Sequence, residues 1–254
     1  MDLSDPHTFG LFLEVYGTLP RAGPGGDEHT RRALDLVPGS TPRDVLDVGC
    51  GPGAQTVCLA RALPQARILG VDLLAEMVQE TNRRLTAAGL AERAQAVMGD
   101  MAQLLVQPGS QDLIWCEGAI YFMGVAQALR AWRPLLAAGG TVAFTEPVWL
   151  TDAPPVEVRT WWLSEYPAMS DDGQIRAQIE TAGYRTVESF TLPASAWWDE
   201  YYQPMQARVE ALQARLPDDP AAAEVVRSAH VEIDMFQRFS ENYSYAFYIV
   251  QPND

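Results

Sequence analysis

VLDVGCGPGAQT, residues 45–56, is a short apolar run that ends in three closely spaced glycines and leads into a helical pattern. Turns of this kind bring backbone N–H groups close to a ligand. Dinucleotides, nucleoside triphosphates and sulfonium nucleosides are all bound by glycine-rich turns. Other features of the sequence are needed to distinguish these three classes of ligand.

Around this stretch, strand and helix patterns alternate. Buried strands are predicted at 44–49, 67–72, 94–99, 112–116 and 140–146, with amphipathic helices between them. This alternation predicts a doubly wound α/β fold with a parallel sheet. After residue 150 the pattern changes to a helix at 175–184, a strand at 185–192, a long helical stretch broken at Pro217 and Pro220, and a final strand at 243–250.

Composition narrows the function classes. The 254 residues carry a formal net charge of −15 and contain no lysine, so all 18 basic residues are arginines. A nucleic-acid partner is disfavoured by this charge, and a P-loop lysine or Schiff-base lysine is excluded. The three cysteines and three histidines form no metal-binding motif. With no leader or membrane-spanning segment apparent, we expect a soluble, cytoplasmic protein.

Four features follow one another in an informative order. Asp47, Gly49, Gly51 and Gly53 spell D-x-G-x-G-x-G between a strand and a helix. Asp72 ends the second strand, where an acid can accept hydrogen bonds from a ribose. Asp100 and Met101 follow the third strand. The glycine spacing is not G-x-G-x-x-G, and Asp47 would repel a pyrophosphate but attract an amino group.

In these residues the chain resembles the S-adenosylmethionine-dependent methyltransferases with a Rossmann-like fold, from about Asp44 to Glu146. The resemblance implies a seven-stranded, mostly parallel sheet with helices on both faces, an antiparallel last strand and a helical insertion between the last two strands. One domain would span 1–254, with a helical cover at 1–40 and a helical lid at 194–242.

The resemblance also implies which residues bind the cofactor, S-adenosylmethionine. These are Asp47 for the methionyl ammonium, Gly49 and Gly51 in the turn, Asp72 with Leu73 at the ribose, and Asp100 and Met101 at the adenine. Tyr16 and Arg21 would approach its carboxylate, with Glu117 nearby. The simpler interpretations are a helix cap for Asp72, a turn residue for Asp100 and a surface charge for Arg21.

The acceptor is expected outside the carboxyl ends of the strands, where segments 117–123, 146–155 and 194–204 arrive. Glu117 and Tyr121 are the candidate catalytic residues, and the candidate substrate contacts are Tyr121, Trp149, Trp197, Trp198 and Tyr201. The alternative is that Glu117 makes a structural contact and that the aromatic residues form core. We expect no metal site.

The predicted function is methyl transfer to a small-molecule acceptor at N, O or C, by in-line displacement. Two alternatives are a nicotinamide-dependent oxidoreductase and a non-catalytic S-adenosylmethionine-binding protein. The sequence is also compatible with a homodimer.

Overall fold

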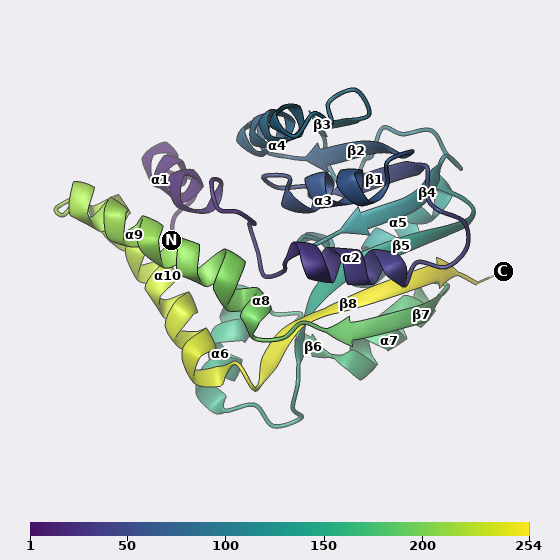
Figure 1. The fold of residues 1–254 in the computed structure, drawn as a ribbon. Helices are drawn as coiled ribbons and strands as arrows, with labels where there is room; N and C mark the ends of the chain where they lie inside the picture. The colour runs from purple at the N-terminus through teal and green to yellow at the C-terminus, as the bar shows by residue number, and fades with distance from the viewer. Residues whose placement is uncertain (254) are drawn as a thin grey trace.

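Strand β1 (Asp44–Val48) is buried along nearly its whole length, as expected of a parallel strand covered on both faces. The computed structural model describes residues 1–253. The other strands are β2 (Arg67–Asp72), β3 (Ala94–Met98), β4 (Gln111–Cys116), β5 (Leu136–Trp149), β6 (Ser170–Asp171), β7 (Tyr184–Thr191) and β8 (Tyr243–Pro252). Their order is β3-β2-β1-β4-β5-β8-β7, and β6 pairs with the end of β5 (Figure 1).

The strands β1 to β5 run parallel, whereas β8 runs antiparallel to both β5 and β7. Val142 of β5, for example, lies opposite Val250 of β8. The expected fold class is therefore confirmed, with the two-residue β6 as an addition that no sequence pattern indicated. The strand order reverses between β1 and β4, and ligands of such sheets bind at the carboxyl ends beside this point.

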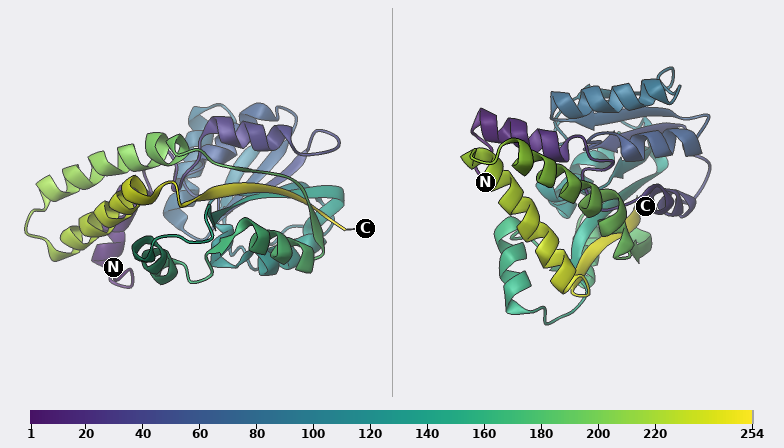
Figure 2. Two further views of the ribbon diagram at one scale, coloured as in Figure 1. Left: turned by 90° about the horizontal axis from the view of Figure 1, so that it is seen from below. Right: turned by 60° about the vertical axis from the view of Figure 1, so that its left-hand side comes forward.

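Helices cover both faces of the sheet (Figures 1 and 2). They are α1 (Pro6–Tyr16), α2 (Asp27–Asp35), α3 (Ala54–Ala62), α4 (Ala75–Ala87), α5 (Val125–Trp132), α6 (Val156–Glu165), α7 (Asp172–Thr181), α8 (Ser195–Trp197), α9 (Gln203–Arg215) and α10 (Pro220–Phe239). Short turns occur at η1 (Ile120–Phe122), η2 (Arg133–Leu135) and the π-helical η3 (Trp198–Tyr202). On one face, Leu129 of α5 and Ile179 of α7 share a core with Val142. On the other, Ala33 of α2 and Leu59 of α3 belong to a second core.

The insertion between β7 and β8 consists of α8, η3, α9 and α10. The last two form a helical hairpin beside one end of the sheet, and α1 packs against both of them (Figures 1 and 2). The break between them falls at the predicted prolines, because Pro220 occupies the first turn of α10 and Asp219 caps it by accepting from the N–H groups of Ala221 and Ala222. The N-terminal segment and the insertion thus lie on the same side of the molecule.

The structure changes one predicted boundary substantially. An amphipathic helix is predicted between the strands at 112–116 and 140–146, but α5 ends already at Trp132. Pro134 explains this end, because a proline has no N–H to donate to the carbonyl oxygen four residues earlier, which interrupts the helical hydrogen bonds. Strand β5 then begins at Leu136 and includes Gly139 and Gly140, with Gly139 at a φ of +78°.

Residues 1–253 contain neither a membrane-spanning helix nor a cluster of metal ligands. No helix in this range combines the length and apolar character needed to cross a membrane. Within the same range, no three or more His, Cys, Asp or Glu side chains are grouped so that they would hold a metal ion.

Candidate functional site

The glycine turn connects β1 to α3. Gly49, Gly51 and Gly53 have φ angles of +68°, +52° and +87°, which side chains with a Cβ rarely adopt. A Cβ on Gly49 would also lie 2.4 Å from the Cβ of Ala119. The N–H groups of Gly49 and Cys50 both donate to the carbonyl oxygen of Val71. The turn is therefore held firmly against the end of β2.

Asp72 lies beside this turn at the end of β2. Its Oδ2 accepts a hydrogen bond from the N–H of Gly51 at 2.8 Å, and its Oδ1 accepts one from the N–H of Leu74 at 3.0 Å. The next residue, Leu73, is 68% exposed. A carboxylate has about four lone-pair positions, so Asp72 keeps acceptor capacity for a ligand. The structure brings Asp72, Leu73 and the turn together.

Asp100 and Met101 follow β3 at the same edge of the sheet. The Cε of Met101 lies 3.6 Å from the position that a Cβ on Gly49 would take. The carbonyl oxygen of Met101 accepts from Trp132 Nε1 at 2.9 Å, which fixes this segment. Asp100 is exposed, and its Oδ1 accepts from the N–H of Ala102 at 2.8 Å. Met101 therefore lies next to the glycine turn. The exposed carboxylate of Asp100 stabilises the chain bend that follows β3.

Asp47 lies beneath the turn and is completely buried. Its Oδ2 accepts from the hydroxyl of Thr56 at 2.5 Å, and Gln55 Nε2 lies 3.5 Å from its Oδ1. Burial raises the pKa of Asp47 to about 7, against the opposing effect of the Thr56 hydrogen bond. Asp47 is thus ready to change its charge when a cationic group approaches.

Glu117 and Arg21 are found together, inside an ion-pair cluster. Glu117 Oε2 accepts from Arg21 Nη1 at 3.0 Å, while its Oε1 accepts from Trp115 Nε1 and the hydroxyl of Thr30. Arg21 is 3% exposed and also pairs with Asp27 and Glu200. Both oxygens of Glu117 are therefore occupied by protein donors, which favours the structural interpretation of this residue.

Tyr16 is the last residue of α1. Its ring stacks on Phe12 with centroids 4.4 Å apart. The pKa of its hydroxyl is raised, first by burial and then by the nearby carboxyl group of Glu232 on α10. Tyr16 therefore faces the helical insertion.

The aromatic candidates divide into two groups. Trp197 is 2% exposed, stacks on Phe236 with centroids 5.0 Å apart and donates from Nε1 to the hydroxyl of Ser244 at 3.0 Å. Packing thus accounts for its position. Trp149 and Trp198 are half-buried. Their contact with a substrate stays a prediction.

Tyr121 and Tyr201 have polar surroundings instead. Tyr121 meets Tyr166 edge-on with ring centroids 5.7 Å apart. The hydroxyl of Tyr201 donates to Glu232 Oε1 at 3.0 Å. These two tyrosines therefore lie beside carboxyl or hydroxyl groups that sequence reasoning did not select.

Glu146, Tyr166 and Glu232 were missed as candidate site residues. Glu146 is completely buried on β5, and its Oε1 accepts from the hydroxyl of Tyr166 at 2.6 Å. A signal for it existed, since a carboxyl group ends the apolar run GTVAFTE where this strand reaches its carboxyl edge. Glu232 had no such signal, because one acidic residue in an amphipathic helix is usually solvated.

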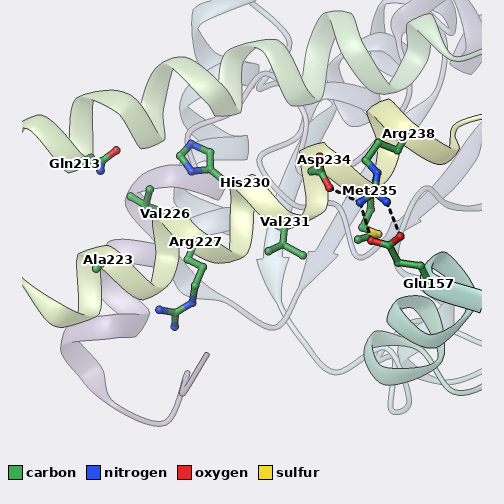
Figure 3. Close-up of a pocket in the computed structure, with 10 residues that line it drawn as sticks. All are labelled: Glu157, Gln213, Ala223, Val226, Arg227, His230, Val231, Asp234, Met235 and Arg238. Atoms are coloured by element: carbon green, nitrogen blue, oxygen red, sulfur yellow. Dashed lines mark hydrogen bonds and ion pairs between the residues drawn. The ribbon is translucent and has the colours of Figure 1, made fainter.

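A separate groove of about 480 Å³ lies on the surface of the helical insertion (Figure 3). Arg238 pairs there with Glu157 and Asp234. The other lining residues are Gln213, Ala223, Val226, Arg227, His230, Val231 and Met235. None of the candidate residues lines this groove.

Comparisons with known proteins agree with this geometry. A family described as a methyltransferase domain matches residues 45–140. A trans-aconitate 2-methyltransferase of an Azoarcus species is 30% identical over 208 residues, covering 77% of this chain and 72% of that protein. The chain therefore belongs to the S-adenosylmethionine-dependent methyltransferases. The matched region contains the glycine turn, Asp72 and Met101.

Other relatives of this methyltransferase match less of the chain or only its fold. A trans-aconitate 2-methyltransferase of Paracidovorax citrulli is 38% identical over 127 residues, covering 48% of this chain. The chain spans about half of that relative's length, 46%. A methyltransferase of Geobacter sulfurreducens, solved with S-adenosyl-L-homocysteine, has a TM-score of 0.82 at 21% identity and covers 98% of both chains. This last likeness concerns the fold, including the helical insertion.

Proposed function

We propose that this methyltransferase binds S-adenosylmethionine at the glycine turn and transfers its methyl group to a small-molecule acceptor. The observation that carries the proposal is the 2.8 Å hydrogen bond from the N–H of Gly51 to Asp72 Oδ2. This hydrogen bond joins the glycine turn to the side chain of Asp72, which lies at the edge formed by the carboxyl ends of the parallel strands. This edge, next to the reversal of strand order, is where such folds bind nucleosides.

The residues present fit such a cofactor. Asp72 would accept hydrogen bonds from the ribose hydroxyls, and Met101 would pack on the adenine with Asp100 near its amino group. Asp47 would stabilise the methionyl ammonium from beneath the turn, through Thr56 or Gln55, because its own carboxyl group is completely buried. Tyr16 and Arg21 remain candidates for binding the carboxylate of the cofactor's methionyl group, although Arg21 is already paired with three acidic side chains.

The bound cofactor would supply an electrophilic methyl group on a positively charged sulfur. The protein then has to align the acceptor and exclude water. The rings of the half-buried Tyr121 and the buried Tyr201 suit that role. Glu117 would act as a positioning residue, because it fixes the N-terminal segment through Arg21. A homodimer, a cytoplasmic location and the limits of the cover and lid segments stay predictions from the sequence.

Calorimetric titration of the full chain with S-adenosylmethionine and, separately, with NADH tests the proposal. We expect binding of the former only, followed by release of S-adenosylhomocysteine when an acceptor is present. Binding of NADH alone would support the oxidoreductase alternative. Cofactor binding without transfer to any amine, phenol or quinone would support a non-catalytic binding protein.

A further inference from the structure

Glu146 has a carboxyl oxygen that no part of the protein satisfies. The residue lies on β5 opposite Ala246 of β8 and is completely buried. Tyr166 donates to its Oε1, but its Oε2 is buried without any hydrogen-bond partner within the described residues. Buried polar atoms are paired in the great majority of cases, so an unpaired carboxyl oxygen indicates a missing partner.

Glu232 approaches the same region from α10. Its Oε1 accepts from the hydroxyl of Tyr201, and Tyr202 lies beside it with a buried, unpaired hydroxyl. Burial raises the pKa of Glu232 to about 7, while the Tyr201 hydrogen bond opposes that rise. A second carboxyl group is therefore held where its charge is costly unless a partner arrives.

Tyr121 lies within electrostatic range of both carboxyl groups. The pKa of its hydroxyl is raised by burial first and then by the charges of Glu232 and Glu146. The pKa of Tyr245 is raised by burial and by Tyr121, Glu146 and Glu232. Both glutamates thus lie within electrostatic range of the same tyrosines. We name the five residues Glu146, Glu232, Tyr121, Tyr166 and Tyr245 the acceptor cluster.

The acceptor cluster has no cation of its own. The chain has no lysine, and Arg21 is the only buried arginine among residues 1–253. The guanidinium of Arg21 is already bound by Glu117, Asp27 and Glu200. An acidic acceptor would therefore bring negative charge to two glutamates without compensation, whereas a cation would neutralise them.

Resting on the proposed methyl transfer, we infer that the acceptor is an amine, bound as an ammonium ion that donates to Glu146 Oε2 beside the edge-packed rings of Tyr121 and Tyr166. The faces of these rings attract a cation as well. The inference differs from what the names of the trans-aconitate 2-methyltransferases indicate, because trans-aconitate is an anion and not an amine.

The chemistry balances without any further reagent. Glu146 Oε2 takes one proton from the ammonium, which frees the lone pair of the nitrogen. That lone pair forms the N–C bond to the methyl group while the C–S bond breaks, and its electron pair returns to sulfur. The methylated product leaves as a cation. Burial raises the pKa of Glu146 to about 8, so the empty site holds this carboxyl group mostly protonated at neutral pH. A bound ammonium ion favours the ionised form, with loss of that proton to solvent, and the ionised Oε2 can then take the proton from the nitrogen.

A set of ligands matched in shape tests the inference. The full chain, saturated with S-adenosylhomocysteine, is titrated calorimetrically with phenethylamine, 2-phenylethanol and phenylacetate. A second set replaces the phenyl compounds with propylamine, propanol and propionate, and trans-aconitate is titrated as well. We expect an amine to bind at least about tenfold more tightly than its alcohol and acid analogues. Glu146→Gln should weaken amine binding by about tenfold or more and leave S-adenosylmethionine affinity unchanged.

The control variant is Glu157→Gln, which removes an exposed carboxylate paired with Arg238 (Figure 3) and should change neither affinity. Tighter binding of an acid or alcohol, no binding of either amine, or amine binding unaffected by Glu146→Gln would overturn the inference. Samples without S-adenosylhomocysteine separate the two proposals. Absence of S-adenosylmethionine binding to the unmodified chain refutes the proposed function, whereas methyl transfer from S-adenosylmethionine to phenylacetate, 2-phenylethanol or trans-aconitate, and not to an amine, refutes only the inference of an amine acceptor.

Discussion

The Nη1 of Arg21 lies 3.0 Å from Oε2 of Glu117, so a buried ion pair joins the N-terminal segment to the loop after β4. The Nε of the same guanidinium reaches Glu200 in η3, 3.1 Å away. The hydroxyl of Thr30 in α2 donates to the other oxygen of Glu117 at 2.7 Å. Three segments far apart in the sequence therefore meet at one arginine beside the glycine turn.

Arg21→Met should strongly destabilise the protein. The substitution leaves the 6%-exposed Glu117 side chain without its cation, and breaking a buried pair in this way costs about 3–5 kcal/mol. Urea denaturation should show this loss in the free energy of unfolding. Arg238→Met, which breaks half-exposed pairs with Glu157 and Asp234, should cost about 0–1 kcal/mol. Equal losses in the two variants would mean that the Arg21 cluster is no stronger than surface ion pairs.

Asp72→Ala should weaken S-adenosylmethionine binding by about 2–3 kcal/mol, because it removes a charged acceptor of ribose hydrogen bonds. Calorimetry measures this directly. Asp44→Ala is the matched control, since Asp44 begins the neighbouring strand at the opposite edge of the sheet and pairs with the exposed Arg67. Unchanged affinity in Asp72→Ala would show that this carboxylate only holds the turn.

Gly49→Ala should disrupt the turn. The left-handed backbone costs a residue with a Cβ about 1–2 kcal/mol, and the new Cβ would also lie 2.4 Å from Ala119. We expect a lower melting temperature together with loss of cofactor binding. Gly10→Ala is the control, because Gly10 lies within α1 with nothing within 4 Å of a new Cβ. The free energy of unfolding of Gly10→Ala should rise by about 0.5–1 kcal/mol. A tolerated alanine at 49 would contradict the close approach of Ala119.

Stability should depend on pH through Glu146. Its ordinary pKa of 4.5 is raised to about 8 by burial, against the hydrogen bond from Tyr166. Between these two values the unfolded chain has lost the proton that the folded chain keeps, so the free energy of unfolding falls as the pH rises. Below the lower value both states are protonated, and above the higher value both are ionised.

Urea denaturation at about pH 5 and about pH 9 tests this dependence. We expect a lower free energy of unfolding at the higher pH, and a smaller difference between the two pH values in Glu146→Gln. Tyr166 donates to Glu146, and Tyr121, Tyr245, Tyr248 and Cys116 lie within electrostatic range of it. Glu232 contributes in the same direction because its pKa is also raised. Glu157→Gln is the control. The pKa of Glu157 is lowered by Arg238, so its contribution is lost only at acid pH. An identical fall in Glu146→Gln and the unmodified chain would rule out this titration.

The sequence alone determined the fold class and the cofactor half of the site. Strands between 44 and 146 were recognisable because each contains a short, mostly apolar run, although β3 proves to be largely exposed. The turn was recognisable because its backbone favours glycine. Asp72 and Met101 could be placed at one edge because parallel strands end there together. These are local rules, and each can be read within a few residues of the chain.

Only the tertiary structure decided what surrounds the acceptor. Glu146 and Glu232 are 86 positions apart in the numbering and come from β5 and α10, yet both act on Tyr121. Likewise, Arg21 and Glu200 meet only because the helical insertion folds back over the N-terminal segment. The physical reason is that burial and pairing give these side chains their charges and pKa values. Both depend on long-range packing, which no local pattern in the sequence records.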